Sequence, residues 1–288
     1  MTPLSDLLLS IVPADSIPAH LKSYIPGVSP FSTWPVVSTV IVSYLVFIFA
    51  AREFMKDLPS FKLQTLFRFH NALLSTGSLV LLLLIMEEVA SVRMNVGTYD
   101  SMCAPSSWTD RLELYYIVNY YFKYYELLDT LFLVLKKKPL TAFLHVFHHA
   151  STALLCFSWT VISINLLVHV VMYYYYYATA GGAKFWWKKY LTIMQIMQII
   201  IDLFLFYFGL YQHYVYKYFP ALPHFGDCSG SESAALFGCA LLTGYLLLFL
   251  DFYMGTYLKT SSSKAKANGV SQTVVSNGNS HTALFPAV

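Results

Sequence analysis

The chain has 288 residues, of which 57% are apolar, 17% are aromatic and only 11% are charged. Soluble domains carry about 25% charged residues, so this composition excludes an ordinary soluble protein and indicates an integral membrane protein. The formal net charge of +3 is small and gives no support for nucleic-acid binding.

The N-terminal segment, residues 1–33, is interrupted by prolines and lacks the basic flank and long apolar core of a cleavable signal peptide, so we expect it to be retained. Leu8, Leu9 and Ile11 alternate with polar residues in this segment. That pattern is compatible with a short interfacial helix and equally with a loop. We expect the segment to lie outside the cytosol.

Apolar runs near the ~20 residues that cross a bilayer recur throughout residues 34–259. The seven runs cover residues 35–51, 71–90, 113–135, 140–159, 161–180, 191–212 and 234–258. We therefore predict one all-α membrane domain with seven transmembrane helices. Six helices is the alternative, because the fourth and fifth runs nearly touch. The tail, residues 260–288, is rich in Ser, Asn and Gly without an apolar period, and we predict that it is disordered.

Basic residues segregate to one side of the seven predicted spans. Those on that side are Arg52, Lys56, Lys62, Arg68, Lys136, Lys137, Lys138, Lys184, Lys188, Lys189, Lys259, Lys264 and Lys266. Only Lys22, Arg93, Arg111 and Lys217 fall on the other side. Because Lys and Arg in short loops stay preferentially in the cytosol, the pattern predicts a cytosolic C-terminus and a non-cytosolic N-terminus.

The four cysteines divide between loops and spans. Cys103 and Cys228 fall in the two long loops on the non-cytosolic side, where an oxidising lumen permits a disulfide, and we expect them to pair. Two free thiols is the alternative. Cys156 and Cys239 fall within spans and are expected to pack as small apolar residues.

Polar residues of five predicted spans recur at one depth, in the cytosolic half. At a rise of about 1.5 Å per residue from the cytosolic ends, one layer contains the following side chains. They are Lys123, Glu126, Asp129, His145, His148, His149, His169, Gln195, Gln198, Asp202 and Asp251. Residues three and four apart share a helix face, so the sets within each span point the same way. Because ionisable groups inside a membrane are costly and usually functional, we predict a polar chamber that opens toward the cytosol.

Such a chamber suits proton abstraction by His or a carboxylate, and nucleophilic attack by an imidazole whose proton a second group accepts. Structural explanations remain for each set. Hydrogen-bonded packing is the less favoured alternative for the histidines, and an ion-pair network is the alternative for Lys123, Glu126 and Asp129. Gln195 and Gln198 are typical of interhelical hydrogen bonds.

Four ordered motifs carry a family resemblance. They are K-x-x-E-x-x-D-T at residues 123–130, H-x-x-H-H at 145–149, H-x-x-M-Y-x-Y-Y at 169–176 and T-x-x-Q-x-x-Q at 192–198. In these motifs the chain resembles the ELO family of fatty acid elongases. The resemblance covers the third to sixth predicted spans, extends to His70 and Asn71 in the second, and is weak in both tails.

The resemblance implies a 3-ketoacyl-CoA synthase of the endoplasmic reticulum membrane. Such an enzyme joins a long-chain acyl-CoA with malonyl-CoA and releases carbon dioxide and free CoA. The fold expected is a seven-helix bundle that encloses a tunnel for the acyl chain, with malonyl-CoA as co-substrate and no bound cofactor or metal. Expected partners are membrane lipid and the ketoacyl reductase, dehydratase and enoyl reductase of the elongation cycle. A homo-oligomer is an open alternative.

The resemblance also suggests residue roles. His148 is the preferred nucleophile, forming an acyl-imidazole, while His145, His149 and His169 position or polarise the thioester. Glu126 and Asp129, supported by Lys123, would orient the imidazoles. Cys156 is disfavoured as the nucleophile because it lies about two helical turns deeper than the histidines.

Other residues are expected to bind substrate. Gln195 and Gln198 would contact carbonyl or pantetheine groups, and Tyr173 and Tyr176 would contact substrate. The lysines that would attract the CoA phosphates are Lys137, Lys184, Lys188 and Lys189, although topogenic charge explains them equally well.

Two other functions are alternatives to fatty acid elongation. H-x-x-H-H also occurs in membrane di-iron desaturases and hydroxylases, which need about eight histidine ligands. The chain has nine histidines, of which only five, His70 included, lie in the cytosolic layer, and this disfavours a di-iron core. A seven-helix transporter would carry its polar groups near the midplane on discontinuous helices, which the sequence does not indicate.

Overall fold

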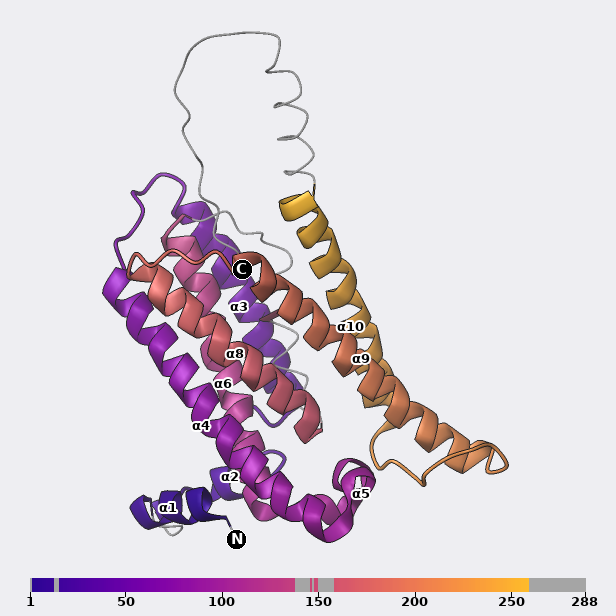
Figure 1. The fold of residues 1–288 in the computed structure, drawn as a ribbon. Helices are drawn as coiled ribbons and strands as arrows, with labels where there is room; N and C mark the ends of the chain where they lie inside the picture. The colour runs from indigo at the N-terminus through magenta and orange to yellow at the C-terminus, as the bar shows by residue number, and fades with distance from the viewer. Residues whose placement is uncertain (1, 13–15, 138–145, 147, 150–157, 259–288) are drawn as a thin grey trace.

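The computed structural model describes residues 2–12, 16–137, 146, 148–149 and 158–258. Within these residues the chain is helical and forms no strand (Figure 1). The elements are α1 (Pro3–Ile11), α2 (Ala19–Lys22), α3 (Trp34–Phe54), α4 (Gln64–Val96), α5 (Thr98–Cys103), the 3-10 turn η2 (Pro105–Ser107), α6 (Asp110–Leu135), α8 (Trp159–Ala180), α9 (Lys188–Tyr218), α10 (Glu232–Tyr253) and the π-helical turn η3 (Met254–Leu258).

Five helices are long and apolar enough to cross a membrane, namely α3, α4, α8, α9 and the continuous segment Glu232–Tyr257. The chain is therefore a multi-pass membrane protein of the all-α class. The third predicted span is also a long helix, α6, but it carries too many charged residues to count among the five. The fourth, 140–159, falls almost entirely outside the described residues, as does Cys156. The seven-helix count stays a prediction.

Helix ends follow local chemistry. The side chain of Thr109 accepts a hydrogen bond from the backbone N–H of Leu112 at 3.2 Å and so caps α6, because the first N–H groups of a helix have no partner within it. Gly97 ends α4 with a φ of 86°, a conformation that glycine adopts without steric cost. At 33 residues α4 is about 50 Å long, more than the ~30 Å of hydrocarbon it would cross.

The N-terminal segment contains a helix, α1, and a neighbouring helix caps it. The carboxylate of Glu87 in α4 accepts hydrogen bonds from the backbone N–H groups of Leu4 at 2.8 Å and Ser5 at 2.9 Å. A carboxylate at a helix N-terminus also interacts favourably with the helix dipole. Arg111 of α6 pairs with Asp6 at 3.0 Å, so α1 is fixed to two long helices.

The long helices pack in two groups. One contains α3, α4, α6 and α8, with α4 in contact with both α6 and α8, and its core includes Leu81, Ile85, Tyr115 and Leu166. The other is the α9–α10 pair, whose core includes Phe206 and Tyr245. Figure 1 shows this pair lying beside α8. Helix α9 also contacts α8, so the two groups meet along α8.

The molecule has two chemically different ends. At one end the backbone of Phe61 donates to Leu135 at 3.0 Å, and the Gln64 side chain donates to the carbonyl of Ala180. These contacts bring the loops that follow α3, α6 and α8 to the same end of the molecule. We call this the basic end, because its loop residues include Lys56, Lys62, Lys136, Lys137 and Lys184.

The opposite end carries α1, α5 and the connection from α9 to α10 (Figure 1). Cys103 and Cys228 are joined there by a disulfide, and we call this the disulfide end. Backbone and side-chain contacts reinforce the link: Ser229 donates to the Cys103 carbonyl at 2.9 Å, and Tyr99 donates to the Gly226 carbonyl at 2.7 Å. The connection before α10 is therefore fastened to α5. Cys239 is a free, buried cysteine in α10.

Candidate active site

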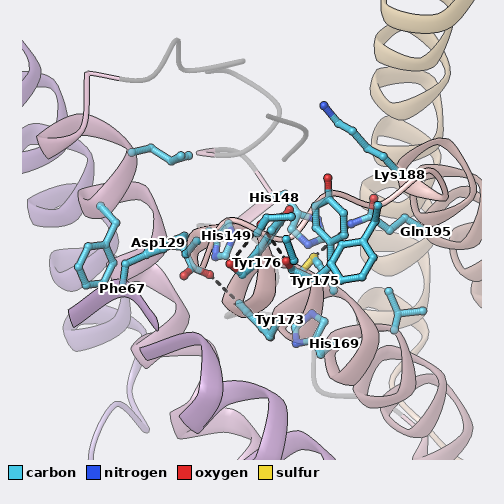
Figure 2. A pocket seen from close by; sticks show the side chains of 18 of the residues that line it. Phe67, Asp129, His148, His149, His169, Tyr173, Tyr175, Tyr176, Lys188 and Gln195 are labelled. Carbon is cyan, nitrogen blue, oxygen red and sulfur yellow. Dashed lines mark hydrogen bonds between the residues drawn. The ribbon is translucent and has the colours of Figure 1, made fainter. Parts of the chain in front are cut away.

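A cavity of about 680 Å³ lies near the basic end, between α6, α8, α9, α10 and the described histidines 148 and 149 (Figure 2). Its lining comes from α4, α6, the His148–His149 segment, α8, the connection after α8, α9 and α10. The predicted site residues on its wall are Asp129, His148, His149, His169, Tyr173, Tyr176, Lys184, Lys188, Gln195 and Gln198. His148 and His169, which the sequence places on different predicted spans, thus border one shared space.

Glu126 and Lys123 lie behind the wall and form a buried network with α8. Glu126 Oε1 lies 3.1 Å from His169 Nδ1 and 3.2 Å from Lys123 Nζ. Lys123 Nζ also donates to Asn165 Oδ1 at 2.7 Å, and Asn165 Nδ2 lies 3.4 Å from His169 Nε2. Because an unpaired charge in a low-dielectric interior is costly, the ammonium and the carboxylate stabilise each other. The network fixes the imidazole of His169.

Asp129 lies one helical turn further along α6 and lines the cavity. Its Oδ2 accepts a hydrogen bond from the Tyr173 hydroxyl at 2.7 Å, and its Oδ1 lies 2.7 Å from His70 Nε2. Figure 2 shows Tyr173 reaching Asp129 across the site. The next residue, Thr130, accepts from Tyr44 of α3 at 2.6 Å. The end of the K-x-x-E-x-x-D-T motif is therefore held by three other helices.

His148 lies against α10 and against His149. The His148 ring lies edge to face with Tyr245, at 4.9 Å between centroids, and with Phe249 at 6.1 Å. The Tyr245 hydroxyl donates to the His148 carbonyl at 3.4 Å. The two imidazoles are 5.7 Å apart, centroid to centroid, and nearly perpendicular. The third histidine of this motif, His145, lies outside the described residues.

The glutamines of α9 face the cavity from the other side. Gln195 donates to the Met172 sulfur at 3.2 Å, a weak acceptor, and Gln198 donates to Asp202 Oδ2 at 3.2 Å. The Tyr176 hydroxyl is buried at the cavity and has no hydrogen-bond partner among the described residues. It therefore has donor and acceptor capacity left for a ligand.

Residues 29–265 match the model of the ELO family, described as the GNS1/SUR4 family. A Schizosaccharomyces pombe protein, "Putative fatty acid elongase 1", is 48% identical over 250 residues, which cover 84% of this chain and 75% of that protein. The chain belongs to the ELO family.

More distant ELO proteins match over a similar extent. "Fatty acid elongase A" of Dictyostelium discoideum is 34% identical, with 84% of this chain and 90% of that protein covered. Human "Very long chain fatty acid elongase 4" is 29% identical, with 86% and 82% covered. The similarity thus includes all helices that build the cavity.

Two lysines expected at this ELO site lie elsewhere. Lys137 follows the end of α6 with a φ of 51°, and its ammonium donates to the Lys56 carbonyl at 2.8 Å. Lys189 lies over the Tyr253 ring, 5.7 Å from the centroid. Neither lines the cavity, whereas their neighbours Lys136 and Lys188 do. Asp251 is exposed and does not line the cavity.

Two contacts at this ELO site were not predicted from the sequence. Asn165 precedes His169 by four residues and so shares its helix face, a spacing that was available in the sequence. His70 lies within an apolar run, where an ionisable residue is itself a signal of function. Among the residues that the structure describes, no three His, Cys, Asp or Glu side chains are grouped so as to hold a metal ion.

Proposed function

We propose that this ELO-family protein is a fatty acid elongase that condenses a long-chain acyl-CoA with malonyl-CoA to give 3-ketoacyl-CoA, carbon dioxide and free CoA. The observation that carries the proposal is the shared cavity, where imidazoles from two segments meet a carboxylate and two glutamines. Relatives along most of the chain bear the name fatty acid elongase, which supports the assignment. Malonyl-CoA is the co-substrate, and the reaction requires no bound cofactor.

The shape and charge of the cavity suit an acyl-CoA. Lys136, Lys184 and Lys188 line it at the basic end, where they would attract the CoA phosphates. Apolar side chains such as Ile199 and Phe249 line the α9–α10 side and would contact the acyl chain. A second, mostly apolar cavity of about 730 Å³ lies at the disulfide end, lined by α5, η2, α6, the start of α8, α9 and the start of α10. We propose that the acyl tunnel runs from the first cavity toward the second.

In the proposed mechanism His148 attacks the acyl thioester carbonyl, the C–S bond breaks, and an acyl-imidazole forms as CoA leaves. A neighbouring histidine accepts the imidazole proton and returns it to the CoA thiolate. Malonyl-CoA then loses carbon dioxide, and the resulting enolate carbon attacks the acyl carbonyl. The new C–C bond forms as the C–N bond to His148 breaks, and a proton from solvent, passed through the neighbouring histidine, restores the His148 imidazole. His145, His149 and His169 position or polarise the thioesters.

The supporting residues hold this arrangement. Glu126 and Lys123 fix His169, and Asp129 fixes Tyr173, so little reorganisation is needed when charge develops on the thioester oxygens. Gln195 and Gln198 would donate to carbonyl or pantetheine oxygens, and the Tyr176 hydroxyl would serve the same purpose.

We propose the endoplasmic reticulum membrane as the location, with the basic end in the cytosol, the disulfide end in the lumen, and an N-terminus that is lumenal and a C-terminus that is cytosolic. The one-sided distribution of Lys and Arg supports this orientation. Residues 34–259 would form the membrane domain. Ketoacyl reductase, dehydratase and enoyl reductase activities would consume the product, and self-association into a homo-oligomer is compatible with this scheme.

The test is incubation of the purified full-length protein with malonyl-CoA and a panel of acyl-CoAs, scoring 3-ketoacyl-CoA by chain length. Intact-mass analysis with acyl-CoA alone should detect acylated protein for the wild type and not for His148→Ala. Absence of 3-ketoacyl product with every acyl-CoA would refute the function. Acylation that persists in His148→Ala would refute the nucleophile alone.

A further inference from the structure

His70 is a buried histidine of α4 that belongs to none of the four motifs. Only 2% of its surface is exposed, and its ring lies 4.9 Å from that of Tyr125 and 5.1 Å from that of Phe132, centroid to centroid. An imidazole inside a membrane-spanning helix loses its hydration and needs a polar partner. The partner of His70 is Asp129, whose Oδ1 lies 2.7 Å from Nε2.

The surroundings of Asp129 indicate which residue donates the hydrogen bond in this contact. The other carboxylate oxygen of Asp129 accepts from the Tyr173 hydroxyl at 2.7 Å, and an ionised carboxylate only accepts, so His70 donates from Nε2. His70 Nδ1 is buried without a hydrogen-bond partner among the described residues. An unpaired N–H there would be costly, so the neutral tautomer with its proton on Nε2 fits the site best.

Two carboxylates one turn apart on α6 are held in the same manner. Glu126 lies between Lys123 and His169 of α8, and Asp129 lies between His70 and Tyr173 of α8. The His169 and Tyr173 rings meet edge to face at 5.3 Å. His70 therefore contacts the Asp129 carboxylate as Lys123 contacts the Glu126 carboxylate. Unlike Lys123, it lies outside the four motifs, although the family resemblance extends to it.

We infer that His70 is a positioning residue of the active site, which donates from Nε2 to Asp129 and thereby fixes the carboxylate that orients Tyr173 at the cavity wall. The inference rests on the proposed condensing activity. His70 itself does not line the cavity and acts only through Asp129. A displaced Asp129 would leave the Tyr173 hydroxyl without a fixed acceptor, and small misplacements near reacting atoms lower turnover strongly.

The experiment compares kcat and KM of full-length wild type, His70→Phe, His70→Gln and Ser78→Ala. His70→Phe keeps a ring beside Tyr125 and Phe132 but has no donor, and its kcat should fall about 10- to 100-fold with KM unchanged. His70→Gln should recover most of the kcat, because its amide N–H is able to donate to Asp129. Ser78→Ala, the matched control, alters a buried residue of the same helix and should behave as wild type.

A double variant separates positioning from general packing. Because His70 acts through Asp129, His70→Phe combined with Asp129→Asn should lose no more kcat than Asp129→Asn alone. Losses that multiply, an equal loss in His70→Gln, or wild-type kcat in His70→Phe would each overturn the inference. Should His70→Phe not fold, His70→Asn takes its place with the same expected values, because its amide is too short to reach Asp129. An inactive wild type would instead refute the proposed function.

Discussion

Glu126 and His169 meet across the interface of α6 and α8, with 3.1 Å between the carboxylate oxygen and imidazole Nδ1. Both side chains are buried, and Lys123 contacts the same carboxylate at 3.2 Å. The carboxylate oxygen and Nδ1 are close enough to interact electrostatically but lack hydrogen-bond geometry, so the carboxylate restrains the imidazole ring without setting its tautomer. One acidic residue thus balances a buried ammonium and also orients an imidazole of the cavity.

Glu126→Gln should therefore affect both stability and turnover. The substitution leaves the Lys123 ammonium buried without its counter-charge, which typically costs about 3–5 kcal/mol. The melting temperature in detergent should fall, and kcat with it. Adding Lys123→Met should restore stability but not kcat, because His169 still lacks its carboxylate. A Glu126→Gln variant as stable as wild type would contradict the ion-pair account.

Substitution of the lysines that line the cavity should raise the KM for acyl-CoA, whereas substitution of neighbouring lysines should not. Lys184→Ala combined with Lys188→Ala should raise KM for acyl-CoA roughly tenfold, since partly exposed charge pairs contribute at most about 1 kcal/mol each. The turnover number should not change, and the effect should shrink at high salt. Lys137→Ala combined with Lys189→Ala is the control and should leave KM at the wild-type value. Equal effects of the two pairs would show that the cavity mouth does not bind CoA.

The second cavity predicts a change in product length. Phe206 lines it and packs so closely on Gly238 that a β-carbon on this glycine would overlap the ring. Phe206→Ala removes a buried ring, which should cost about 3–5 kcal/mol and open space between α9 and α10. With a mixed acyl-CoA panel the products should shift to longer chains. Phe204→Ala, on the exposed face of the same helix, should leave the distribution unchanged. An unchanged distribution of product chain lengths for Phe206→Ala would show that this cavity is not part of the acyl tunnel.

Reduction of the disulfide should destabilise the protein. The bond joins residues 125 positions apart, and removal of a native disulfide typically costs about 2–5 kcal/mol. A reductant should lower the melting temperature of the wild type to that of the double variant Cys103→Ser, Cys228→Ser. The double variant should not respond to reductant, although it retains Cys239. A response of the double variant would assign the effect to another thiol.

The sequence predicted where the long helices lie better than where they end. The predicted run 71–90 is the centre of α4, which continues as far as Gln64 and Val96 because polar and charged residues extend a helix beyond its apolar part. The run 113–135 matches α6 closely. In the N-terminal segment, the alternation of Leu8, Leu9 and Ile11 with polar residues was equally compatible with a helix and with a loop. The helix forms with a cap supplied by Glu87, a residue far away in the sequence.

Helical spacing was a good guide to which side chains share a face and a poor guide to their partners. His169, Tyr173 and Tyr176 line one cavity as expected, because residues three and four apart project from the same side of a helix. Spacing does not show which helix lies opposite, so the contacts of Asp129 with Tyr173 and His70 required the structure. Lys137 lies beyond the last turn of α6, where helical periodicity no longer applies.

The bond between Cys103 and Cys228 has a mechanical consequence. It ties the start of α10 to the end of α5, so the α9–α10 pair is anchored at one extremity, while α9 joins α8 through the connection at the other. The pair is therefore held at both extremities, by the disulfide at one and by the short connection from α8 at the other.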